Sequence, residues 1–383
     1  MNTVQDRIRL SKSFVGAQEA AAVSKVINEG YLGMGSEVES FECDLTQYIG
    51  GGRSVVCVNT GTSALHLAVQ ACGIGPGDEV LIPTITYVAS FQAVSAAGAI
   101  PVPCDVLPDT CTLDVADARR RITSRTRAVM PVHYASGAGS LEETYLLAER
   151  HGLRVIEDAA HAFGCCWKGH RVGATGDIVC FSFDGIKNIT SGEGGAVVTA
   201  DQHVADLVRD ARLLGVEKDT DKRFSGKRSW EFDVARQGWR FHMSNIFAAM
   251  GRVQLRRFET EFAPKRIALA RHYIEILDDL RGVTCFNLDY ENSDIVPHIF
   301  PILISAGKRD SVRGALCRSC IECGLHYKPN HLLSYYGGGR VSLPQAELLY
   351  TELLTLPLHP ELETEEQDFI VDTIRTCLPR VAA

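Results

Sequence analysis

Between residues 54 and 200, short apolar runs alternate with amphipathic stretches of helical spacing. The order is SVVCVN then TSALHLAVQACG, EVLIP then VASFQAVSAAG, and AVMPVH then LEETYLLAERHG. Runs of this length that are rich in β-branched residues favour strands, and the stretches between them favour helices. Strands that alternate with helices predict a mainly parallel sheet with helices on its faces. The sequence therefore predicts an α/β fold.

The chain is long enough for a second, smaller unit. Long helical patterns cover residues 244–280, and the strand-like run HIFPILI follows at 298–304. At roughly 100–200 residues per domain, a chain of 383 residues allows two domains. We expect a large α/β domain over residues 1–245 and a smaller α+β domain over residues 246–383.

Composition narrows the class of protein. Lysine and arginine number 39 against 47 acidic residues, a formal charge of −8. This balance gives no sign of a surface for nucleic acid. The apolar runs are short and interrupted by glycine, proline or charge, so we expect a cytoplasmic protein without membrane association. The 13 cysteines are odd in number and lie mostly in apolar segments, which favours reduced thiols over a disulfide framework.

Several common motifs are missing. Cys317, Cys320 and Cys323 form one local cluster, but a ferredoxin-like run would need a fourth cysteine where Tyr327 stands. No other local spacing suggests metal ligands, so we expect no metal site. Both Gly-Lys pairs are followed by arginine, which excludes a Walker A loop. The turn VNTGTSA has one glycine where a dinucleotide fingerprint has three.

Polar residues gather at three predicted strand ends, where open α/β sheets bind their ligands. The turn at 59–64 runs directly into a helix, whose free N–H groups suit a phosphate. An ordinary connection between strand and helix would look the same. The strand VIED ends in Glu157 and Asp158, where a carboxylate could hold a protonated ring nitrogen or cap the next helix.

The third strand end is a polar, glycine-rich loop between apolar runs at 177–183 and 194–199. It holds Lys187, which partial burial would make an amine nucleophile by lowering its pKa; a solvated surface lysine is the ordinary alternative. A phosphate turn, a carboxylate for a ring nitrogen and a nucleophilic lysine are together what a pyridoxal phosphate enzyme requires. We therefore predict pyridoxal 5′-phosphate as the cofactor.

Nine segments of the chain occur in the order, and at about the spacing, of one known family. They include NTGTSALHLA, GDEVLIPTITYVAS, IEDAAHAFG, KNITSGEGGAVVT and HYKPNH, and they span nearly the whole chain. On these motifs the sequence resembles the nucleotide-sugar aminotransferases of the DegT/DnrJ/StrS family, pyridoxal phosphate enzymes of the aspartate aminotransferase fold (fold type I). The resemblance implies that the large domain binds the cofactor.

The resemblance also implies cofactor contacts. Lys187 would be bonded to the cofactor and would move the proton during the reaction, and Asp158 would hold the pyridinium proton. Tyr87 would stack on the ring, although a core tyrosine under a helix start is the alternative. His161 would contact the phenolic oxygen of the ring. Contacts to the phosphate would come from Thr62, Ser63 and Ser182.

One segment departs from the family pattern. Many relatives carry an asparagine that reaches the cofactor phosphate of the partner subunit, and this chain has Arg240 there. An arginine could still clamp a phosphate, with a full charge. The resemblance implies a homodimer with shared active sites. It places substrate contacts at Tyr31, in an N-terminal glycine-rich loop, and at Lys328 and His331, which could meet a pyrophosphate. Ordinary surface loops are the alternative at these positions.

The expected reaction follows from the same resemblance. Dehydratases of the family have histidine in place of the lysine, so Lys187 favours transamination. KNITSGEGGA is closer to the motif of enzymes that act at C4 than to the KNLGALGDGGA of many C3 enzymes. We expect transfer from L-glutamate to an NDP-4-keto-6-deoxyhexose, giving an NDP-4-amino-4,6-dideoxyhexose in two half-reactions. An aminotransferase for 3-keto sugars and a non-catalytic regulator that binds pyridoxal phosphate are the alternatives.

Overall fold

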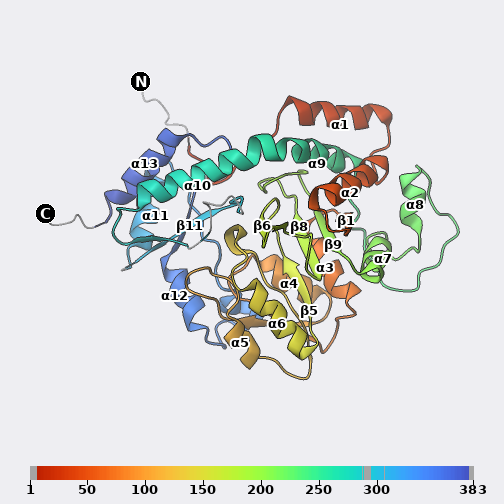
Figure 1. Cartoon of the computed structure of the whole chain (residues 1–383), viewed down its shortest axis with the longest axis horizontal. Coiled ribbons are helices and arrows are strands. Elements are labelled where there is room, and N and C mark those ends of the chain that lie inside the picture. The colour runs from red at the N-terminus through yellow and green to blue at the C-terminus, as the bar shows by residue number, and fades with distance from the viewer. Residues whose placement is uncertain (1–6, 287, 289–294, 306, 379–383) are drawn as a thin grey trace.

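The computed structural model describes residues 7–286, 288, 295–305 and 307–378. Its centre is a seven-stranded sheet (Figure 1). β9 pairs antiparallel with both β1 and β8, and the other neighbours pair in parallel, so β9 alone runs against the rest. The predicted α/β fold with a mainly parallel sheet is confirmed. In sheet order the strands are β1 (Ser54–Val58), β9 (Gly195–Thr199), β8 (Ile178–Ser182), β5 (Arg154–Asp158), β4 (Thr126–Val129), β2 (Glu79–Pro83) and β3 (Ile100–Cys104).

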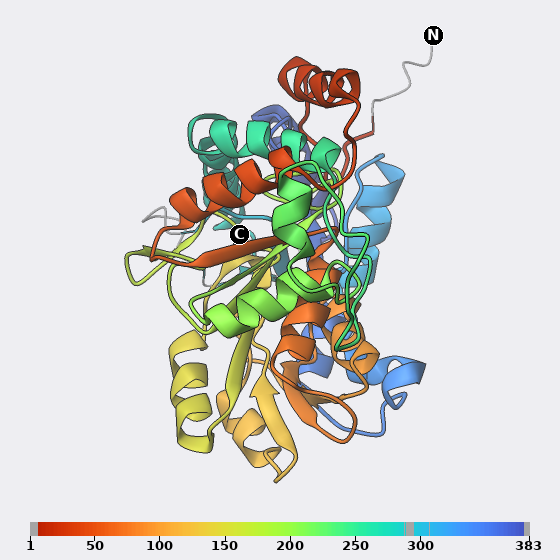
Figure 2. The same cartoon turned by 90° about the vertical axis from the view of Figure 1, so that its right-hand side faces the viewer.

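Helices cover both faces of this sheet, because its strands carry apolar side chains on both sides. Figure 2 shows α6 in yellow and α3 and α4 in orange on opposite sides of the strands. The helices on one face are α3 (Gly61–Ala71), α4 (Val88–Ala96) and α7 (Gln202–Ala211). Those on the other are α2 (Ser36–Ile49), α5 (Val115–Arg120), α6 (Leu141–His151) and α9 (Asn245–Arg257).

The carboxyl-terminal part is a smaller α+β unit. Its three strands pair antiparallel in the order β10, β11, β12. An apolar cluster that includes Ile85 and Tyr134 from the larger unit and Phe286 and Leu353 from the smaller one joins the two. The elements are β10 (Val283–Cys285), β11 (Phe300–Ile304), β12 (Leu353–Leu356), α10 (Ala263–Leu277), α11 (Arg309–Arg318), α12 (Pro344–Glu352) and α13 (Thr364–Arg375).

One long helical rod connects the two units. α9 continues through a π-helical turn, η2 (Phe258–Phe262), into α10, and Figure 1 shows the rod running across both units. α9 packs against α1 (Ala17–Glu29) and α2, whereas α10 packs against α13. The helix that follows residue 245 therefore lies on the larger unit. The division of the chain at residue 245 stays a prediction.

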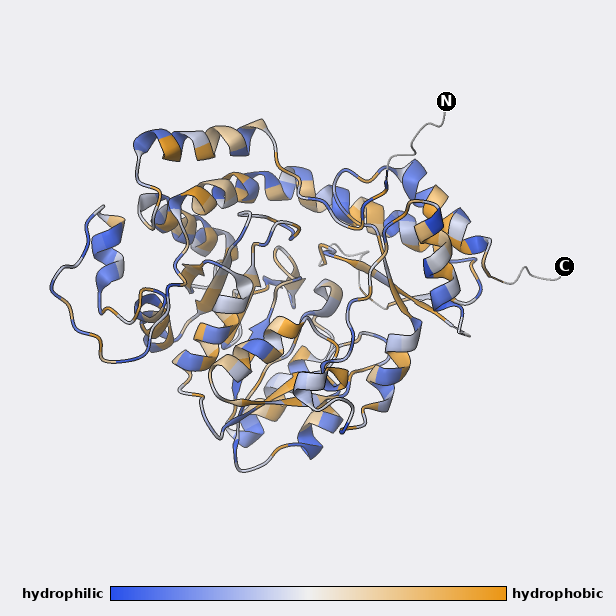
Figure 3. Ribbon diagram, turned by 180° about the vertical axis from the view of Figure 1, so that it is seen from behind, coloured by the Kyte–Doolittle hydropathy of each residue, from blue (hydrophilic) through white to orange (hydrophobic). Residues whose placement is uncertain are grey.

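The remaining elements are short or peripheral. A two-stranded hairpin, β6 (Cys166–Trp167) and β7 (His170–Arg171), follows β5, and α8 (Asp219–Phe224) lies at the edge of the molecule. Single 3₁₀ turns are η1 (Tyr134–Ser136), η3 (Asn330–Leu332) and η4 (Ser334–Tyr336). Figure 3 shows apolar residues concentrated in the central strands and helices of mixed character around them. Within the described residues, no helix combines the length and the apolar character needed to cross a bilayer.

A buried ion pair connects the elements beside the start of α3. The guanidinium of Arg212, which follows α7, is fully buried and pairs with Glu42 of α2. Its Nη1 also donates to the carbonyl of Cys57 at 2.6 Å, and the Glu42 carboxylate accepts the N–H of Cys57 at 2.8 Å. Because β1 leads directly into α3, this pair helps to fix where the first turn of α3 lies.

Removing one partner of this pair should destabilise the fold. In Arg212→Met, Glu42 stays buried without its cation, and we expect the free energy of unfolding in urea to fall by about 3–5 kcal/mol. The double variant Glu42→Leu/Arg212→Met should recover much of the loss, because replacing a whole buried pair by apolar groups is often neutral. Arg209→Met, which breaks a surface pair with Asp206, is the control and should change it by at most about 1 kcal/mol. Equal effects of the two single variants would contradict the interpretation.

Candidate active site

A cavity of about 460 Å³ opens at the carboxyl ends of β5 and β8, beside the start of α3. Ligand sites in proteins commonly have volumes of about 300–1,000 Å³. The carboxyl ends of parallel strands are also where α/β sheets bind ligands. Six of the residues predicted from the sequence line this cavity: Thr62, Tyr87, Asp158, His161, Ser182 and Lys187.

Lys187 extends from the loop after β8 into the cavity. Its Nζ lies 3.3 Å from Nε2 of His298. Burial lowers the pKa of Lys187 from the ordinary 10.5 to about 8, although the carboxylates of Asp158 and Asp184 oppose the shift. A lysine with such a pKa is partly free amine near neutral pH, and the free amine is the form that attacks a carbonyl.

Asp158 ends β5 with its carboxylate in the cavity wall. Its Oδ2 accepts a hydrogen bond from Ser90 Oγ at 2.7 Å, and its Oδ1 accepts one from the N–H of Ala160 at 3.2 Å. Thr86 Oγ1 lies 2.9 Å from the Ser90 hydroxyl and supports it in turn. These contacts fix the carboxylate and leave it acceptor capacity toward the cavity.

The start of α3 and the end of β8 meet closely. A Cβ atom at Gly61 would lie 2.7 Å from the Cβ of Ser182, so only glycine lets the first turn of the helix approach that side chain. The hydroxyl groups of Thr62 and Ser182 therefore border the same part of the cavity, together with the unpaired N–H groups of the first helical turn. Such a cradle suits a phosphate.

Ser63, which was predicted to contact the phosphate, lies outside the cavity wall. Its hydroxyl donates to Asn59 Oδ1 at 2.7 Å, and its N–H donates to Thr60 Oγ1 at 3.0 Å. The side chain is buried and is not part of the cavity wall. Ser63 thus stabilises the turn whose residues Gly61 and Thr62 border the cavity.

The rings of Tyr87 and His161 also border the cavity. Tyr87 stands at the amino end of α4 and is 58% exposed, with its ring centroid 5.7 Å from that of Tyr327. His161 Nε2 lies 3.0 Å from the Tyr327 hydroxyl. Burial and the charge of Lys187 hold the pKa of His161 well below its ordinary value, so the ring is neutral. Its buried Nδ1 has no partner among the described residues.

The HYKPNH segment contributes residues other than those singled out from the sequence. Lys328 is exposed and lies outside the cavity wall. His331 is buried: its Nδ1 lies 2.8 Å from Thr84 Oγ1 and its Nε2 3.3 Å from Glu347 Oε1. Asn330 anchors the turn by donating to the carbonyl of Thr84 at 3.0 Å. The chain therefore turns inward here, and both ring nitrogens of His331 have side-chain partners. The predicted contacts of Lys328 and His331 with a pyrophosphate stay predictions.

His298 and His326 line the cavity but were not predicted as site residues. His326 comes from the segment already singled out, two positions before Lys328, and its Nδ1 lies 2.9 Å from Thr355 Oγ1. His298 begins the apolar run HIFPILI, which indicated only a strand. No local signal marks it, because its neighbour Lys187 is 111 positions away in the sequence.

Tyr31 and Arg240 lie outside this cavity within one chain. The Tyr31 ring packs over Gly35, where a Cβ would lie 2.6 Å from it, and its carbonyl accepts from Asn245 Nδ2 at 3.0 Å. Arg240 is exposed, and its backbone pairs with that of Leu213. Their predicted contacts with substrate and with a partner's cofactor stay predictions.

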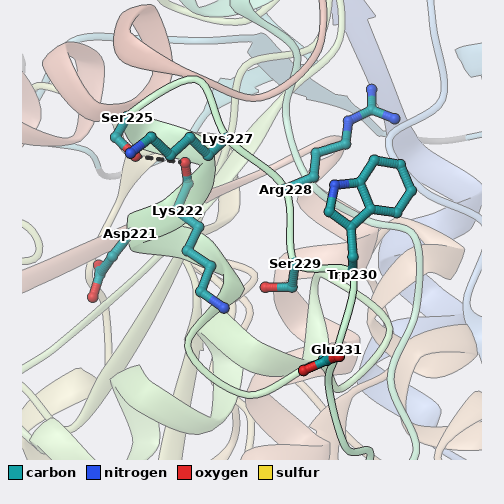
Figure 4. Close-up of a pocket in the computed structure, with 8 residues that line it drawn as sticks. All are labelled: Asp221, Lys222, Ser225, Lys227, Arg228, Ser229, Trp230 and Glu231. Carbon is teal, nitrogen blue, oxygen red and sulfur yellow. Dashed lines mark hydrogen bonds between the residues drawn. The ribbon is translucent and has the colours of Figure 1, made fainter.

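A second hollow of about 760 Å³ lies beside α8, away from Lys187. Its wall includes Lys222, Arg228 and Trp230, and Figure 4 shows the ends of Asp221, Lys222 and Arg228 pointing in different directions. The drawn contact is a hydrogen bond from Ser225 Oγ to the Lys222 carbonyl at 2.9 Å. Because its polar groups do not converge, this hollow lacks the features of a catalytic site.

The residues of the first cavity fit pyridoxal phosphate. The cradle beside Gly61 would hold the phosphate, Asp158 the ring nitrogen, and Lys187 the aldehyde; the orphaned Nδ1 of His161 is a further polar atom in the wall. When bound, this cofactor supplies an electron sink next to the carbon that carries the transferred nitrogen. Within the described residues, no cluster of three or more histidine, cysteine or acidic side chains could hold a metal ion.

A mainly parallel sheet whose strand ends bring together a buried lysine, a fixed carboxylate and a phosphate cradle defines a pyridoxal phosphate enzyme of fold type I. Comparisons with known proteins agree. The profile of the DegT/DnrJ/EryC1/StrS aminotransferase family matches residues 14–375. The chain belongs to this family, whose members are aminotransferases that depend on pyridoxal phosphate, as its motifs predicted.

Solved structures give the same result. The aminotransferase TlmJ from Streptoalloteichus hindustanus is 31% identical, with 97% of this chain and 98% of that chain covered and a TM-score of 0.88. DesV from S. venezuelae is 36% identical over 95% of each chain, with a TM-score of 0.85. The sugar aminotransferase CalS13 from Micromonospora echinospora is 27% identical over 96% of this chain and 99% of that one, with a TM-score of 0.87.

The low pKa of Lys187 can be tested directly. In the full chain freed of cofactor, pH-dependent labelling with an amine reagent, followed by mass spectrometry, should give a midpoint near 8 for Lys187. Free Nα-acetyl-lysine amide, with a pKa of about 10.4, is the reference. Asp158→Asn should lower the midpoint further, because the Asp158 charge stabilises the ammonium form. A midpoint near that of the reference would show that the amine is solvated.

Proposed function

We propose that this enzyme transfers an amino group from L-glutamate to an NDP-4-keto-6-deoxyhexose, giving an NDP-4-amino-4,6-dideoxyhexose. The observation that carries the proposal is the single cavity that holds the low-pKa amine of Lys187 beside the fixed carboxylate of Asp158. A sugar as acceptor is supported by the likeness to the sugar aminotransferase CalS13.

In this proposal each residue of the cavity has one task. Lys187 holds the cofactor and returns a proton to the substrate carbon, Asp158 keeps the ring nitrogen protonated, and Tyr87 covers the ring. His161 contacts the phenolic oxygen as a neutral donor. Thr62 and Ser182 bind the phosphate with the first turn of α3. The contacts to the charged phosphate and to the protonated ring nitrogen are charge-assisted, and hydrogen bonds of that kind are about twice as strong as neutral ones.

We infer the position of amination from a short segment. In KNITSGEGG, the side chains of Thr190 and Ser191 are buried in the framework, and only Lys187 and Glu193 border the cavity. Glu193 stands where the motif of many C3 enzymes has aspartate, so it is the one side chain of this segment that can distinguish the two branches by contact. The match to the C4 motif supports a 4-keto acceptor, with a 3-keto acceptor as the alternative.

We further propose that two copies of the chain share their active sites. Large apolar side chains are exposed just before Arg240: Trp230 at 85%, Phe232 at 59% and Val234 at 46%. Exposed large apolar side chains are common in protein interfaces. In this proposal a partner covers them, and Arg240 reaches the partner's cavity, where its guanidinium binds the cofactor phosphate.

The proposed reaction can be tested with a panel of keto sugars. The purified holoenzyme should convert an NDP-4-keto-6-deoxyhexose to the 4-amino sugar with glutamate as donor, detected by mass spectrometry and NMR. Lys187→Ala is the matched control and should fold but form no adduct that borohydride reduces. Amination of 3-keto sugars alone would replace the C4 assignment. Cofactor absorbance unchanged by glutamate would favour the non-catalytic regulator.

Sharing of active sites predicts complementation between two inactive variants. Lys187→Ala lacks the nucleophile, and Arg240→Ala lacks the arginine proposed to act across the interface. In a mixed dimer, one cavity combines Lys187 from one chain with Arg240 from the other, so remixing the two variants should restore up to about a quarter of the parent activity (half of the dimers are mixed, each with one intact site). No gain on mixing, with subunit exchange verified by mass spectrometry, would place Arg240 outside the partner's site.

A further inference from the structure

His298 contacts the amine on which the proposed reaction depends. It lies just before β11, in the smaller unit, and its Nε2 is 3.3 Å from Lys187 Nζ. Among the described residues, His298 is the side chain that lies within hydrogen-bond distance of the Lys187 amine. The residue is 4% exposed, so water does not compete freely for the contact. Through this imidazole, the smaller unit contacts the nucleophile of the larger one.

The backbone holds this imidazole from two sides. The N–H of His298 donates to Ser136 Oγ at 3.1 Å, and its carbonyl accepts from Arg266 Nη1 at 3.3 Å. The Ser136 hydroxyl also donates to the carbonyl of His161, so one side chain ties both histidine segments together. Ala135 and Ser136 have φ angles of 49° and 77°, a region costly for residues with a side chain. The strained turn at Ala135 and Ser136 therefore lies where it holds the backbone of both His161 and His298.

The second nitrogen of the His298 ring also calls for a partner. Its Nδ1 is buried and unpaired among the described residues. A separate cavity of about 20 Å³ has Ser11 and Thr355 in its wall, and Ile186, His298 and His326 border both it and the main cavity. Because Nδ1 is buried, neither cavity is shown to bring a water against it, and the acceptor role of Nε2 rests on its contact with Lys187.

The charges around the pair favour this arrangement. Burial and the charge of Lys187, with smaller effects from His161, Arg266 and His326, hold the pKa of His298 well below its ordinary value. His298 is then neutral while Lys187 still carries its proton. An ammonium group can only donate, so a neutral His298 facing it must accept. The carboxylates of Asp158 and Asp184 stabilise the ammonium form of Lys187, and the charge of Arg266 opposes them.

We propose that His298 is a positioning residue for the aminotransferase reaction: its Nε2 accepts a hydrogen bond from the Lys187 amine. With one N–H directed at His298, the rest of the amine faces the main cavity, where it meets the cofactor and substrate. This inference rests on the proposed role of Lys187.

The test measures the Lys187 amine itself in the full chain freed of cofactor, by pH-dependent labelling and mass spectrometry. His298→Leu removes the acceptor, which stabilises the ammonium form, so the midpoint for Lys187 should fall by about one pH unit. His298→Gln retains an acceptor oxygen and should bring the midpoint back to within a few tenths of the parent value. His272→Leu, which alters an exposed pair with Asp368, is the control and should change nothing.

An unchanged or raised midpoint in His298→Leu, or a His298→Gln midpoint as low as that of His298→Leu, would overturn the proposal. If His298→Leu does not fold, Ser136→Ala replaces it: loss of the hydroxyl that holds the His298 backbone should lower the midpoint by a smaller amount, and no change would overturn the proposal. Borohydride reduction of the parent holoenzyme distinguishes failure of the proposed role of Lys187 from failure of the proposed role of His298. No adduct at Lys187 refutes its proposed role, whereas an adduct together with unchanged variants refutes only the role of His298.

Discussion

The chemistry of this protein depends on removing one lysine amine from water. An exposed lysine is almost entirely protonated near neutral pH, and burial brings the pKa of Lys187 to about 8. Burial alone would also make the charged form costly, and the carboxylates of Asp158 and Asp184 offset part of that cost. The ring of His298 contacts the amine directly. The pKa of the amine thus lies close to neutral pH, so both its protonated and its free form are populated. A group that must both attack a carbonyl and move a proton needs both forms.

The fold supplies this environment by placing an edge of one sheet against a second unit. β5 and β8 are parallel neighbours, so Asp158 and the loop carrying Lys187 emerge at the same edge of the sheet. α3 begins beside them, and the absence of a side chain at Gly61 lets it approach Ser182. The smaller unit then covers the opening with His298, His326 and Tyr327. Residues of both units line the cavity, and an apolar cluster joins the units at their junction.

Local motifs were reliable guides where a side chain acts at the place its own segment occupies. Asp158 at the end of a strand and Lys187 in a glycine-rich loop both line the cavity, as does Tyr87 at a helix start. Two other predicted residues have neighbours in the framework that bind their side chains, and their predicted ligand contacts stay predictions. Ser63 is used by the turn itself, through Asn59, and His331 is used by Thr84 and Glu347. From the sequence, a polar residue that faces a ligand and one that satisfies the framework look alike.

The sequence by itself determined the alternation of strands and helices, the mainly parallel sheet and the set of motifs that identify the family, because these depend on residue periodicity and on contacts within short segments. Only the tertiary structure decided which polar groups share a cavity, since that depends on contacts between segments that are distant in the sequence, such as the 111 positions between Lys187 and His298. His298 is the clearest case: its run of residues is typical of a strand, and its position beside Lys187 arises only when the smaller unit packs against the larger one.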